Sequence, residues 1–392
     1  MISNDVNNAI ADVLEGTRSY CKFLAANDVG KTGSHQAGIY IKKNAFAILF
    51  PQPGIKGENK DKWVKIRWQN DFETESRFVY YGRETRNEYR ITNFGRNFPF
   101  FTPEYTGALL VLTQQDEDAY TGHVLNSEED IETFLDTFGM SPTETDGLID
   151  VGSVRPEVAE DLAVQAFIDA LTEDFPASDI MSCAARQIHE KVHDHSEYIV
   201  SNPDRKIIDW VDMEYSLFRA LERSRYGERI KQGFSTVDEF VSVANKVLNR
   251  RKSRAGKGLE HHLAAIFDGN NLIYSAQAVT EGNKKPDFIF PSIEAYHDSS
   301  YSADNLISLA SKTTCKDRWR QVLNEADRLK DRHKYLFTLQ QGISAAQMDE
   351  MQAEGVVLVV PKEYIKTYPK DRRERIWSLK KFVDYVKAVE SR

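Results

Sequence analysis

The chain has 392 residues and a formal net charge of −9, with 41% hydrophobic and 28% charged residues. These are the proportions of an ordinary globular protein with room for two or three domains. An acidic chain does not fit a protein that coats nucleic acid nonspecifically, although a sequence-specific DNA enzyme needs only local basic patches. No apolar run is long enough to span a membrane, and the acidic N-terminus predicts no secretory signal. Three widely spaced cysteines, Cys21, Cys183 and Cys315, fit a reducing cytoplasm and do not form a disulfide or zinc framework.

The first part of the chain, to about residue 145, is predicted to be mainly β. Short runs of alternating, β-branched or aromatic residues occur at 38–43, 63–68, 77–84 and 107–114, with Gly, Pro or Asn between them. Asn126 or Ser127 can cap a short helix over 128–138. Residues 141–157 are rich in Pro, Gly, Ser and acids and lack periodicity, which indicates a linker. We therefore expect a domain over 1–145, a linker over 146–165 and a second domain over 166–392.

The second part alternates helix and strand signals. Ser235 is the predicted cap of a helix over 235–250, whose apolar positions form one stripe, and a second helix is predicted over 256–267. Strand-like runs follow at 287–290, 306–311, 335–340 and 355–361, with helices predicted over 319–330 and 343–355. Strands that alternate with helices predict a mixed sheet flanked by helices, an α/β fold.

Two segments concentrate basic residues. One is 249–258, where the first of these predicted helices ends and the second begins, and the other is 82–96. Each is either a solvated basic loop or part of a surface that binds DNA.

One acid–lysine–acid series has the residue types that hydrolysis of a phosphodiester needs. Asp287 opens one predicted strand, Lys312 closes the next, and Glu325 follows in the predicted helix, while Glu260 lies on an earlier helix. On adjacent strands Asp287 and Lys312 can meet at one sheet edge. Two carboxylates can hold Mg²⁺ together with a phosphate oxygen, and the lysine can stabilise the charge that develops on the phosphate. The spacing alone also arises by chance in a chain with 60 acidic residues.

The residues that follow Lys312 can read bases. Lys316 and Arg318 can donate to guanine O6 and N7, and Asp317 can accept from cytosine N4. The alternative is a first helical turn with ordinary surface charges.

Long blocks of the sequence resemble EcoRII-type restriction endonucleases. In the second part these are NRRKSRAGKGLE, VTEGNKKPDFIFPS, AYHD and KTTCKDRWRQVLNEAD, which are similar to the catalytic domain of that family. In the first part AANDVGKTGSHQAGIYI, TRNEYRIT and TGALLVL are similar to its effector DNA-binding domain. The resemblance runs in the same order over nearly the whole chain and is thinnest over 115–209.

The resemblance implies a fold and a set of site residues. The catalytic domain is expected to have the PD-(D/E)xK nuclease core, in the variant whose last acid lies on the helix, and the N-terminal domain is expected to be a β pseudobarrel. The implied catalytic residues are Asp287, Lys312, Glu325, Glu260 and Tyr296, with Asp287 and Glu325 as metal ligands. The implied readers of the C:G pairs are Lys316, Asp317 and Arg318, and the implied contacts to effector DNA are His35, Tyr40, Arg86, Glu88 and Arg90.

The sequence departs from the family at a few positions. Family members hold each flipped-out central base between an aromatic residue and an arginine one helical turn earlier. Tyr215 matches the aromatic residue, but Val211 stands where the arginine would be. Glu84 and Tyr89 replace basic residues of the effector domain, which affects the expected phosphate contacts.

The resemblance also implies an activity and partners. Family members are homodimers that use Mg²⁺ to cut double-stranded DNA at CCWGG, with W being A or T, and a second copy of the site stimulates them. A CCNGG-like site is therefore expected here, with a cytosine methyltransferase encoded nearby and no membrane partner. Two alternatives stay open: a repair-type nuclease of the same fold, and a DNA-binding regulator whose nuclease centre has decayed.

Overall fold

The computed structural model describes residues 4–29, 38–69, 72–95, 98–149, 158–193, 195–316 and 318–391, without the side chains of Val158, Ala159, Ala255 and Arg318. The chain divides into two compact units. The first unit comprises Met1–Ser153, Gln340–Met348 and Lys366–Arg373, and the second comprises Val154–Leu339, Asp349–Ile365 and Glu374–Arg392. Two short segments from late in the chain thus group with the N-terminal unit, which a division at a single linker did not anticipate.

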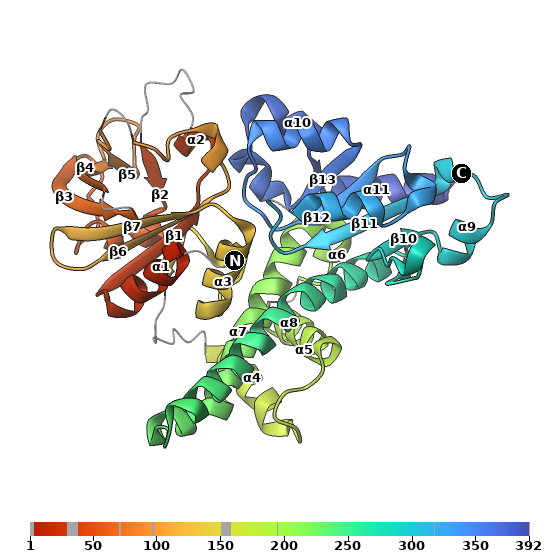
Figure 1. Ribbon diagram of the computed structural model, residues 1–392, viewed down its shortest axis with the longest axis horizontal. Coiled ribbons are helices and arrows are strands. Elements are labelled where there is room, and N and C mark those ends of the chain that lie inside the picture. The colour runs from red at the N-terminus through yellow and green to blue at the C-terminus, as the bar shows by residue number, and fades with distance from the viewer. Residues whose placement is uncertain are drawn as a thin grey trace. The chain divides into compact units, whose positions relative to one another are not determined.

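The first unit is built on one eight-stranded sheet, with the strand order β2-β5-β4-β3-β7-β6-β1-β8 (Figure 1). Its pairs are antiparallel except for β3 and β7, which are parallel. The strands are β1 (Arg18–Phe23), β2 (Ile39–Ile41), β3 (Lys60–Trp68), β4 (Phe72–Tyr81), β5 (Glu88–Thr92), β6 (Leu109–Gln114), β7 (Ala119–Leu125) and β8 (Gly147–Ile149). The helices are α1 (Asn4–Glu15), α2 (Ala26–Val29) and α3 (Glu128–Phe138). The prediction of a mainly β N-terminal domain is confirmed.

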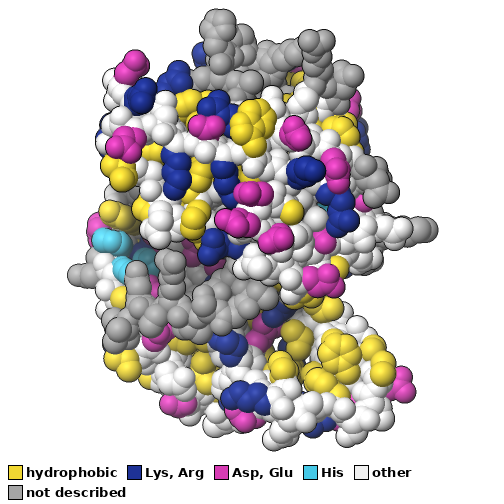
Figure 2. Space-filling view, turned by 90° about the vertical axis from the view of Figure 1, so that its left-hand side faces the viewer, with side chains coloured by type: hydrophobic (Ala, Val, Ile, Leu, Met, Phe, Trp, Pro, Cys, Tyr) yellow, Lys and Arg dark blue, Asp and Glu magenta, His cyan; other side chains and the backbone are white. Residues whose placement is uncertain are grey.

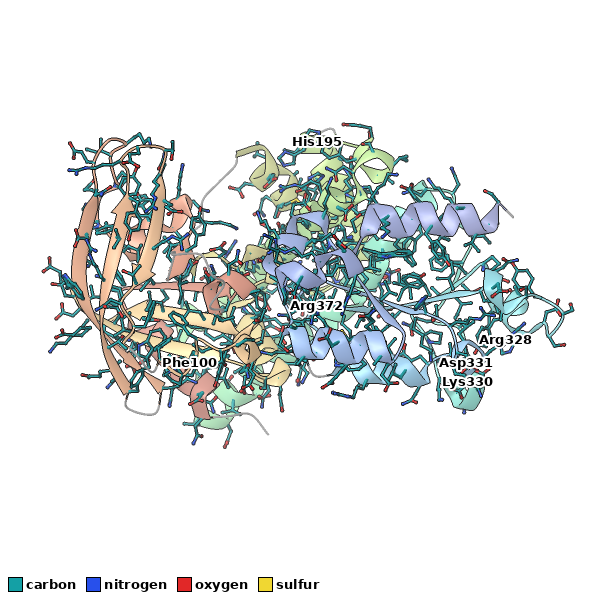
Figure 3. All side chains as sticks on the ribbon, turned by 90° about the horizontal axis from the view of Figure 1, so that it is seen from above. Phe100, His195, Arg328, Lys330, Asp331 and Arg372 are labelled. Carbon is teal, nitrogen blue, oxygen red and sulfur yellow. The ribbon has the colours of Figure 1, made fainter. Side chains whose placement is uncertain are left out.

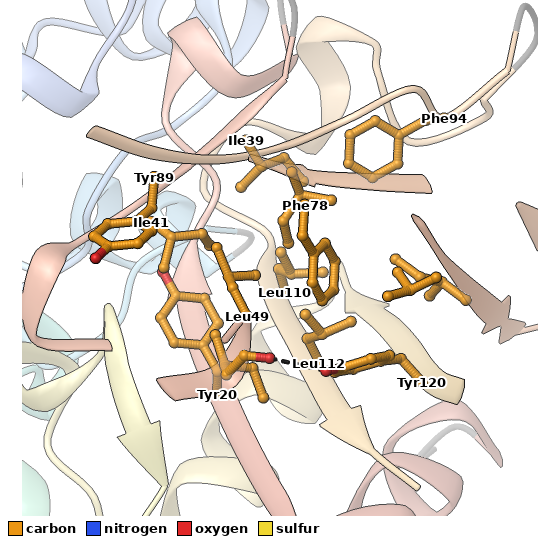
Figure 4. Packing of buried hydrophobic residues seen from close by; sticks show 14 of the residues in the cluster. Tyr20, Ile39, Ile41, Leu49, Phe78, Tyr89, Phe94, Leu110, Leu112 and Tyr120 are labelled. Carbon is orange, nitrogen blue, oxygen red and sulfur yellow. Dashed lines mark hydrogen bonds between the residues drawn. The ribbon is translucent and has the colours of Figure 1, made fainter. Parts of the chain in front are cut away.

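Both faces of β6 are buried. Along β6, Leu110 and Leu112 belong to the aromatic-rich core that Figure 4 shows, whereas Leu109 and Val111 pack with α1 and α3 in a second core. Successive strand residues point to opposite faces, so the continuous apolar run predicts burial on both sides. Ser127 caps α3 by accepting a hydrogen bond from the Asp130 backbone N–H, as the sequence predicted.

The part of the predicted linker that the structure describes is regular. β8 pairs with β1, with Ser19 opposite Ile149, and α4 (Val158–Ala170) begins soon afterwards. The residues 150–157 between them lie outside the described part of the chain.

The second unit contains a six-stranded mixed sheet with the order β14-β13-β12-β11-β10-β9. Strands β9, β10 and β11 are antiparallel, and β11 to β14 are parallel. The strands are β9 (Ser275–Ala276), β10 (Phe288–Phe290), β11 (Ile307–Lys312), β12 (Lys334–Thr338), β13 (Val356–Val360) and β14 (Trp377–Ser378). The helices are α4, α5 (Ser178–His193), α6 (Tyr198–Ser201), α7 (Pro203–Gln232), α8 (Val237–Gly269), α9 (Ile293–His297) and α11 (Leu379–Glu390), together with α10 (Ala345–Ala353), whose residues 345–348 belong to the first unit. The predicted α/β sheet flanked by helices is confirmed, and no helix of the described residues is long and apolar enough to cross a membrane.

The basic segment 249–258 is helical, so the prediction of a loop between two helices is wrong. α8 runs unbroken from Val237 to Gly269, and Thr236, not Ser235, caps it by accepting from the Glu239 N–H. Arg251 and Arg254 bond to Glu222 and Glu214 of α7. These ion pairs along the α7–α8 contact replace the solvated loop.

The predicted α-helix over 319–330 is also not formed. The segment consists of two 3₁₀ helices, Arg318–Asn324 and Asp327–Leu329, with Glu325 at the bend between them. In an α-helix the Glu325 carbonyl would accept from the N–H four residues later. Instead it accepts the Thr280 hydroxyl at 2.7 Å, and the Asp327 N–H donates to Glu281 at 3.3 Å. Side chains from another loop therefore replace the helical hydrogen bonds.

Candidate active site

Asp287 lies immediately before β10, at the end of the antiparallel pair that β10 forms with β11. Phe288 is opposite Leu309 in this pair, which brings Asp287 beside Ser311. Asp287 Oδ2 accepts hydrogen bonds from the Ser311 backbone N–H at 2.6 Å and from its hydroxyl at 3.0 Å. Lys312 is the last residue of β11, so the acid and the lysine meet at one sheet edge, as their spacing predicted.

Glu260 comes to the same edge from α8 and is joined to Asp287 by one amide. Gln277 Nε2 donates to Glu260 Oε2 at 2.9 Å and to Asp287 Oδ1 at 2.7 Å. The backbone N–H of Gln277 also donates to the Asp287 carbonyl at 3.0 Å. Gln277 was not among the residues singled out from the sequence.

Glu325 completes the group of carboxylates. Burial, and after it the charge of Asp287, raise the pKa of both Glu325 and Glu260 to about 7. Burial also raises the pKa of Asp287, while the two Ser311 hydrogen bonds act in the opposite direction. The positive charge of Lys312 lowers the pKa of all three carboxyls. The site therefore concentrates more negative charge than one lysine balances.

This excess charge fits a divalent cation, which relieves the repulsion between carboxylates. Within the described residues no three His, Cys, Asp or Glu side chains form a ready-made metal site. Mg²⁺ takes one or two carboxylates from a protein and completes its octahedron with water and phosphate oxygens. Asp287 and Glu325 are the residues that would hold the ion, with Glu260 beside Asp287. When bound, the ion would polarise the phosphate and lower the pKa of a water.

Tyr296 does not bond to these carboxylates. It is buried on α9, and its hydroxyl donates to Glu281, 2.7 Å from Oε2, and accepts from the Arg328 N–H at 3.1 Å. Arg328 also donates to the Tyr301 and Ala295 carbonyls, and Figure 3 shows it beside Lys330 and Asp331. Tyr296 thus connects α9 to the segment that follows Glu325.

The candidate base-reading residues are only partly described. Asp317 lies outside the described residues, and so does the side chain of Arg318. Lys316 is buried, with 2% of its surface exposed. A contact from the Lys316 ammonium to a base therefore requires this segment to open.

The region of Tyr215 contains an arginine that its own helix does not supply. Tyr215 and Val211 both lie on α7 and are buried, together with Glu214. The Arg254 guanidinium, from α8, lies 4.0 Å from the centre of the Tyr215 ring and donates to Glu214 Oε1 at 3.0 Å. A guanidinium thus faces Tyr215 even though Val211 replaces the arginine expected on α7.

The adjacent histidines of α8, His261 and His262, do not lie together as two ligands of one metal ion would. His262 is buried beside Glu214, with 2.9 Å between Nε2 and Oε2, whereas His261 bonds to the Ser178 hydroxyl. The two histidines thus pack against different helices.

Three of the expected effector contacts lie together in the first unit. Tyr40 of β2 is opposite Arg90 of β5, and Arg90 Nε donates to Glu88 Oε1 at 3.2 Å. Arg86 is exposed in the turn before β5, and its guanidinium lies 5.4 Å from the centre of the Tyr81 ring. His35 lies outside the described residues.

Tyr89 and Glu84, which replace basic residues of the family's effector domain, have different surroundings. Tyr89 is buried, and its hydroxyl accepts from the Gly54 N–H at 2.6 Å, so this position belongs to the core. Glu84 is exposed and has a positive φ of 54°. Only Glu84 can therefore alter a surface contact directly.

The surface over β3 and β4 has a different character. Figure 2 shows Lys and Arg interspersed with Asp and Glu there, and pairs such as Arg77–Asp61, 2.9 Å apart, neutralise one another. This mixed surface lacks the single-sign charge that binds phosphates.

Sequence reasoning missed the residues that hold the carboxylates in place. Ser311, Gln277 and Thr280 are common polar residues without motif spacing, and their roles depend on the register of β10 with β11 and on two loops. No signal in the sequence separates them from other surface residues.

Comparisons with known proteins agree over both units. The family model described as EcoRII C terminal matches residues 218–383, and that described as restriction endonuclease EcoRII, N-terminal, matches residues 13–144. The chain is 39% identical over 386 residues to the type II restriction enzyme EcoRII of Escherichia coli, covering 93% of this chain and 92% of that protein. It is 25% identical over 196 residues to the type II restriction enzyme SsoII of Shigella sonnei, covering 43% of this chain and 63% of that protein.

Two solved structures align with part of the chain. Metal-depleted Ecl18kI in complex with uncleaved, modified DNA aligns with a TM-score of 0.45 and 20% identity, covering 61% of this chain and 85% of that one. The complex of restriction endonuclease PspGI with substrate DNA aligns with a TM-score of 0.45 and 16% identity, covering 55% of this chain and 94% of that one.

Proposed function

Since the chain belongs to the EcoRII family of type II restriction endonucleases, we propose that it cleaves double-stranded DNA at a CCNGG-like site, with CCWGG the preferred sequence. The cleavage would use Mg²⁺, and a second copy of the site bound by the N-terminal unit would stimulate it. A cytosine methyltransferase encoded nearby would protect the host's own copies of the site.

One observation carries this proposal. Asp287, Lys312 and Glu325 come from three different parts of the chain, yet the charge of Lys312 acts on both carboxyls and the charge of Asp287 acts on Glu325. An acidic pair with one lysine at a sheet edge can hold a cation and a scissile phosphate together. A regulator with a decayed centre would have no need to keep Asp287 so near Glu260 and Glu325 that its charge raises their pKa values.

The proposed chemistry divides among these residues. Asp287 and Glu325 would position the ion against the scissile phosphate, and the Lys312 ammonium would stabilise the negative charge that develops on the phosphate oxygens. Asp287 stays correctly oriented because Ser311 donates twice to one of its oxygens. These two bonds use the lone pairs of Oδ2, whereas Oδ1 accepts one hydrogen bond from Gln277 and has a second lone pair for a cation.

A homodimer would supply the second active site that a double-strand break needs. The apolar stripe of α8 is exposed over its first half: Val237 is 77% exposed, Phe240 52% and Val241 46%. Ile230, at the end of α7, is 63% exposed beside it. Hydrophobic side chains gather over the lobe formed by these helices, toward the lower right of Figure 2. A second copy of the chain that packs on this surface would bury it.

For the N-terminal unit we propose the effector role. Tyr40, Glu88 and Arg90 lie on neighbouring strands, and Arg86 precedes the second of these strands. Arginines can bind phosphates or guanine, and Glu88 orients the Arg90 guanidinium through two hydrogen bonds.

The decisive experiment is run-off sequencing of unmodified plasmid DNA after incubation with the protein and Mg²⁺. Discrete ends at CCWGG on both strands are expected. Ends confined to mismatched or modified DNA would replace the proposal with a repair nuclease, and the absence of any Mg²⁺-dependent ends would favour a DNA-binding regulator.

A further inference from the structure

Gln277 makes three hydrogen bonds that bear on the active site. Its side-chain amide donates to Glu260 Oε2 at 2.9 Å and to Asp287 Oδ1 at 2.7 Å. Its backbone N–H donates to the Asp287 carbonyl at 3.0 Å. One residue thus fixes both the backbone and the carboxylate of Asp287 and links them to a carboxylate on α8.

The backbone of Gln277 has an unusual conformation. It follows β9, where Ala276 is opposite Phe288 of β10, and has a φ of +51°. L-residues other than Gly, Asn and Asp rarely adopt this left-handed region, where the Cβ is crowded. The turn directs the side chain between the two acids, and the three hydrogen bonds hold it there.

Global stability does not account for this arrangement. Gln277 is exposed, and a hydrogen bond that competes with water contributes only about 1 kcal/mol to folding. Residues in strained backbone conformations gather at functional sites. Gln277 is the donor between two acids, and without it the negative charge of Asp287 would push the Glu260 side chain away.

We propose that Gln277 is a positioning residue that holds Glu260 at a fixed place beside Asp287, so that the two carboxylates face the cation together. This inference rests on the proposed nuclease function and extends it to a residue outside the acid–lysine–acid series. Both of its N–H groups donate to anions, so a side chain without donors would free Glu260 to turn toward solvent. Groups that orient metal ligands typically change metal affinity or activity by about 10- to 100-fold when removed.

The test compares Gln277→Met with the wild type in the full-length protein. Methionine keeps the length of the side chain but has no donor. Binding of Mn²⁺, followed by the electron paramagnetic resonance signal of the free ion, should weaken by about 10-fold. The Mg²⁺ concentration for half-maximal cleavage should rise by a similar factor, while metal-free binding to DNA and the melting temperature stay at the wild-type values.

Two further variants keep the result interpretable. Asn271 is exposed, has a positive φ of 58° and lies outside the carboxylate group, so Asn271→Met makes the matched change and should bind Mn²⁺ like the wild type. Gln277→Gly removes the amide and relieves the backbone, so it should weaken Mn²⁺ binding without lowering the melting temperature.

The outcomes separate this inference from the proposed function. Wild-type Mn²⁺ binding in both Gln277 variants would overturn the inference even if the enzyme cuts CCWGG. Equal weakening in Asn271→Met would overturn it too, because the effect would then come from the connection between α8 and β9. A wild-type protein that cuts no DNA with Mg²⁺ would reject the nuclease function, whereas the Mn²⁺ measurement would still test the positioning of Glu260.

Discussion

Arg254 donates to Glu214 at 3.0 Å, and both side chains are almost completely buried between α7 and α8. Glu214 also accepts from the Ser182 hydroxyl at 2.5 Å, and although burial opposes it, these bonds and His262 lower the pKa of Glu214 to about 2. The carboxylate therefore stays charged in the interior and holds α5, α7 and α8 together. A buried pair of this kind contributes little over an apolar pair, but the loss of one partner is strongly destabilising.

Gly258 leaves the space beside it that the Glu214 carboxylate of this ion pair occupies. A Cβ at Gly258 would lie 2.4 Å from Glu214 Oε1, whereas a Cβ at Gly256, two residues earlier on α8, would have no neighbour within 4 Å. Gly258→Ala should therefore push the carboxylate away from Arg254 and destabilise the fold by about 3 kcal/mol. Gly256→Ala should stabilise it by up to about 1 kcal/mol, because alanine favours the helix. Urea unfolding of both variants measures these changes in the free energy of unfolding. A Gly258→Ala variant as stable as the wild type would contradict the role given to Glu214.

The two errors in the helix predictions show what local sequence does and does not determine. Hydrophobic periodicity located α3, α10 and strands such as β3, β6 and β12, because it reflects which face each element buries, but it did not locate α5 or α7. The basic run 249–258 lacks that stripe, so it resembled a loop, yet its arginines are neutralised by Glu222 and Glu214 of a different helix. The segment around Glu325 has good helix formers, but Thr280 and Glu281 take its backbone groups. Both outcomes depend on partners distant in the chain.

The candidate site was predictable to a similar degree. The order acid, lysine, acid was readable because those residue types are chemically distinctive, and the strand pairing brings Asp287 to the end of β11 as expected. The supporting residues could not be predicted from the sequence. Ser311 acquires its role only through the register of β10 with β11, and Gln277 only through a left-handed turn.

Lys312 should be indispensable for cleavage and dispensable for binding. Lys312→Ala removes the positive charge that acts on all three carboxyls, so the rate of cleavage at saturating Mg²⁺ should fall by about 100-fold or more. Site-specific binding, measured by gel shift without Mg²⁺, should change little. Lys330→Ala, at an exposed position, is the control and should cut normally. Full activity of Lys312→Ala would remove this residue from the mechanism.

The metal-free protein should become less stable as the pH rises through the range in which Glu325 ionises. Burial and Asp287 raise its pKa from 4.5 to about 7, so the folded state binds this proton more tightly than the unfolded chain. Stability from this group is complete below about pH 4.5 and is lost progressively up to about pH 7. Glu325→Gln should match the wild type at pH 4.5 and exceed it at pH 8 by on the order of 1 kcal/mol, allowing for solvent screening.

Denaturant unfolding in EDTA at the two pH values measures this difference. Mg²⁺ at pH 8 should stabilise the wild type more than Glu325→Gln, because the ion binds the ionised carboxylate. A variant that is less stable than the wild type at pH 8 would show that Glu325 has a favourable partner and not a repulsive one.

The exposed stripe of α8 should control the oligomeric state. Phe240→Asp places a charge at the centre of the surface formed by Ile230, Val237, Phe240 and Val241, so sedimentation velocity should show a monomer where the wild type is a dimer. Ile273 is equally exposed outside this stripe, and Ile273→Asp should leave the dimer intact. The monomeric variant should fail to cut both strands in one encounter. Dimers of Phe240→Asp would place the interface elsewhere.

Arg90 should control stimulation by a second site without affecting the catalytic unit. Arg90→Ala removes the guanidinium that Glu88 orients on β5, and the loss of one charged contact to DNA corresponds to roughly 10-fold in affinity. The variant should therefore need about 10-fold more added cognate duplex to stimulate cleavage of a one-site plasmid. Arg77→Ala serves as the control, because Arg77 pairs with Asp61 on the mixed-charge surface of β3 and β4. If both variants respond to added duplex like the wild type, the effector site does not include Arg90. If Arg77→Ala alone loses the response, the effector surface lies over β3 and β4 instead.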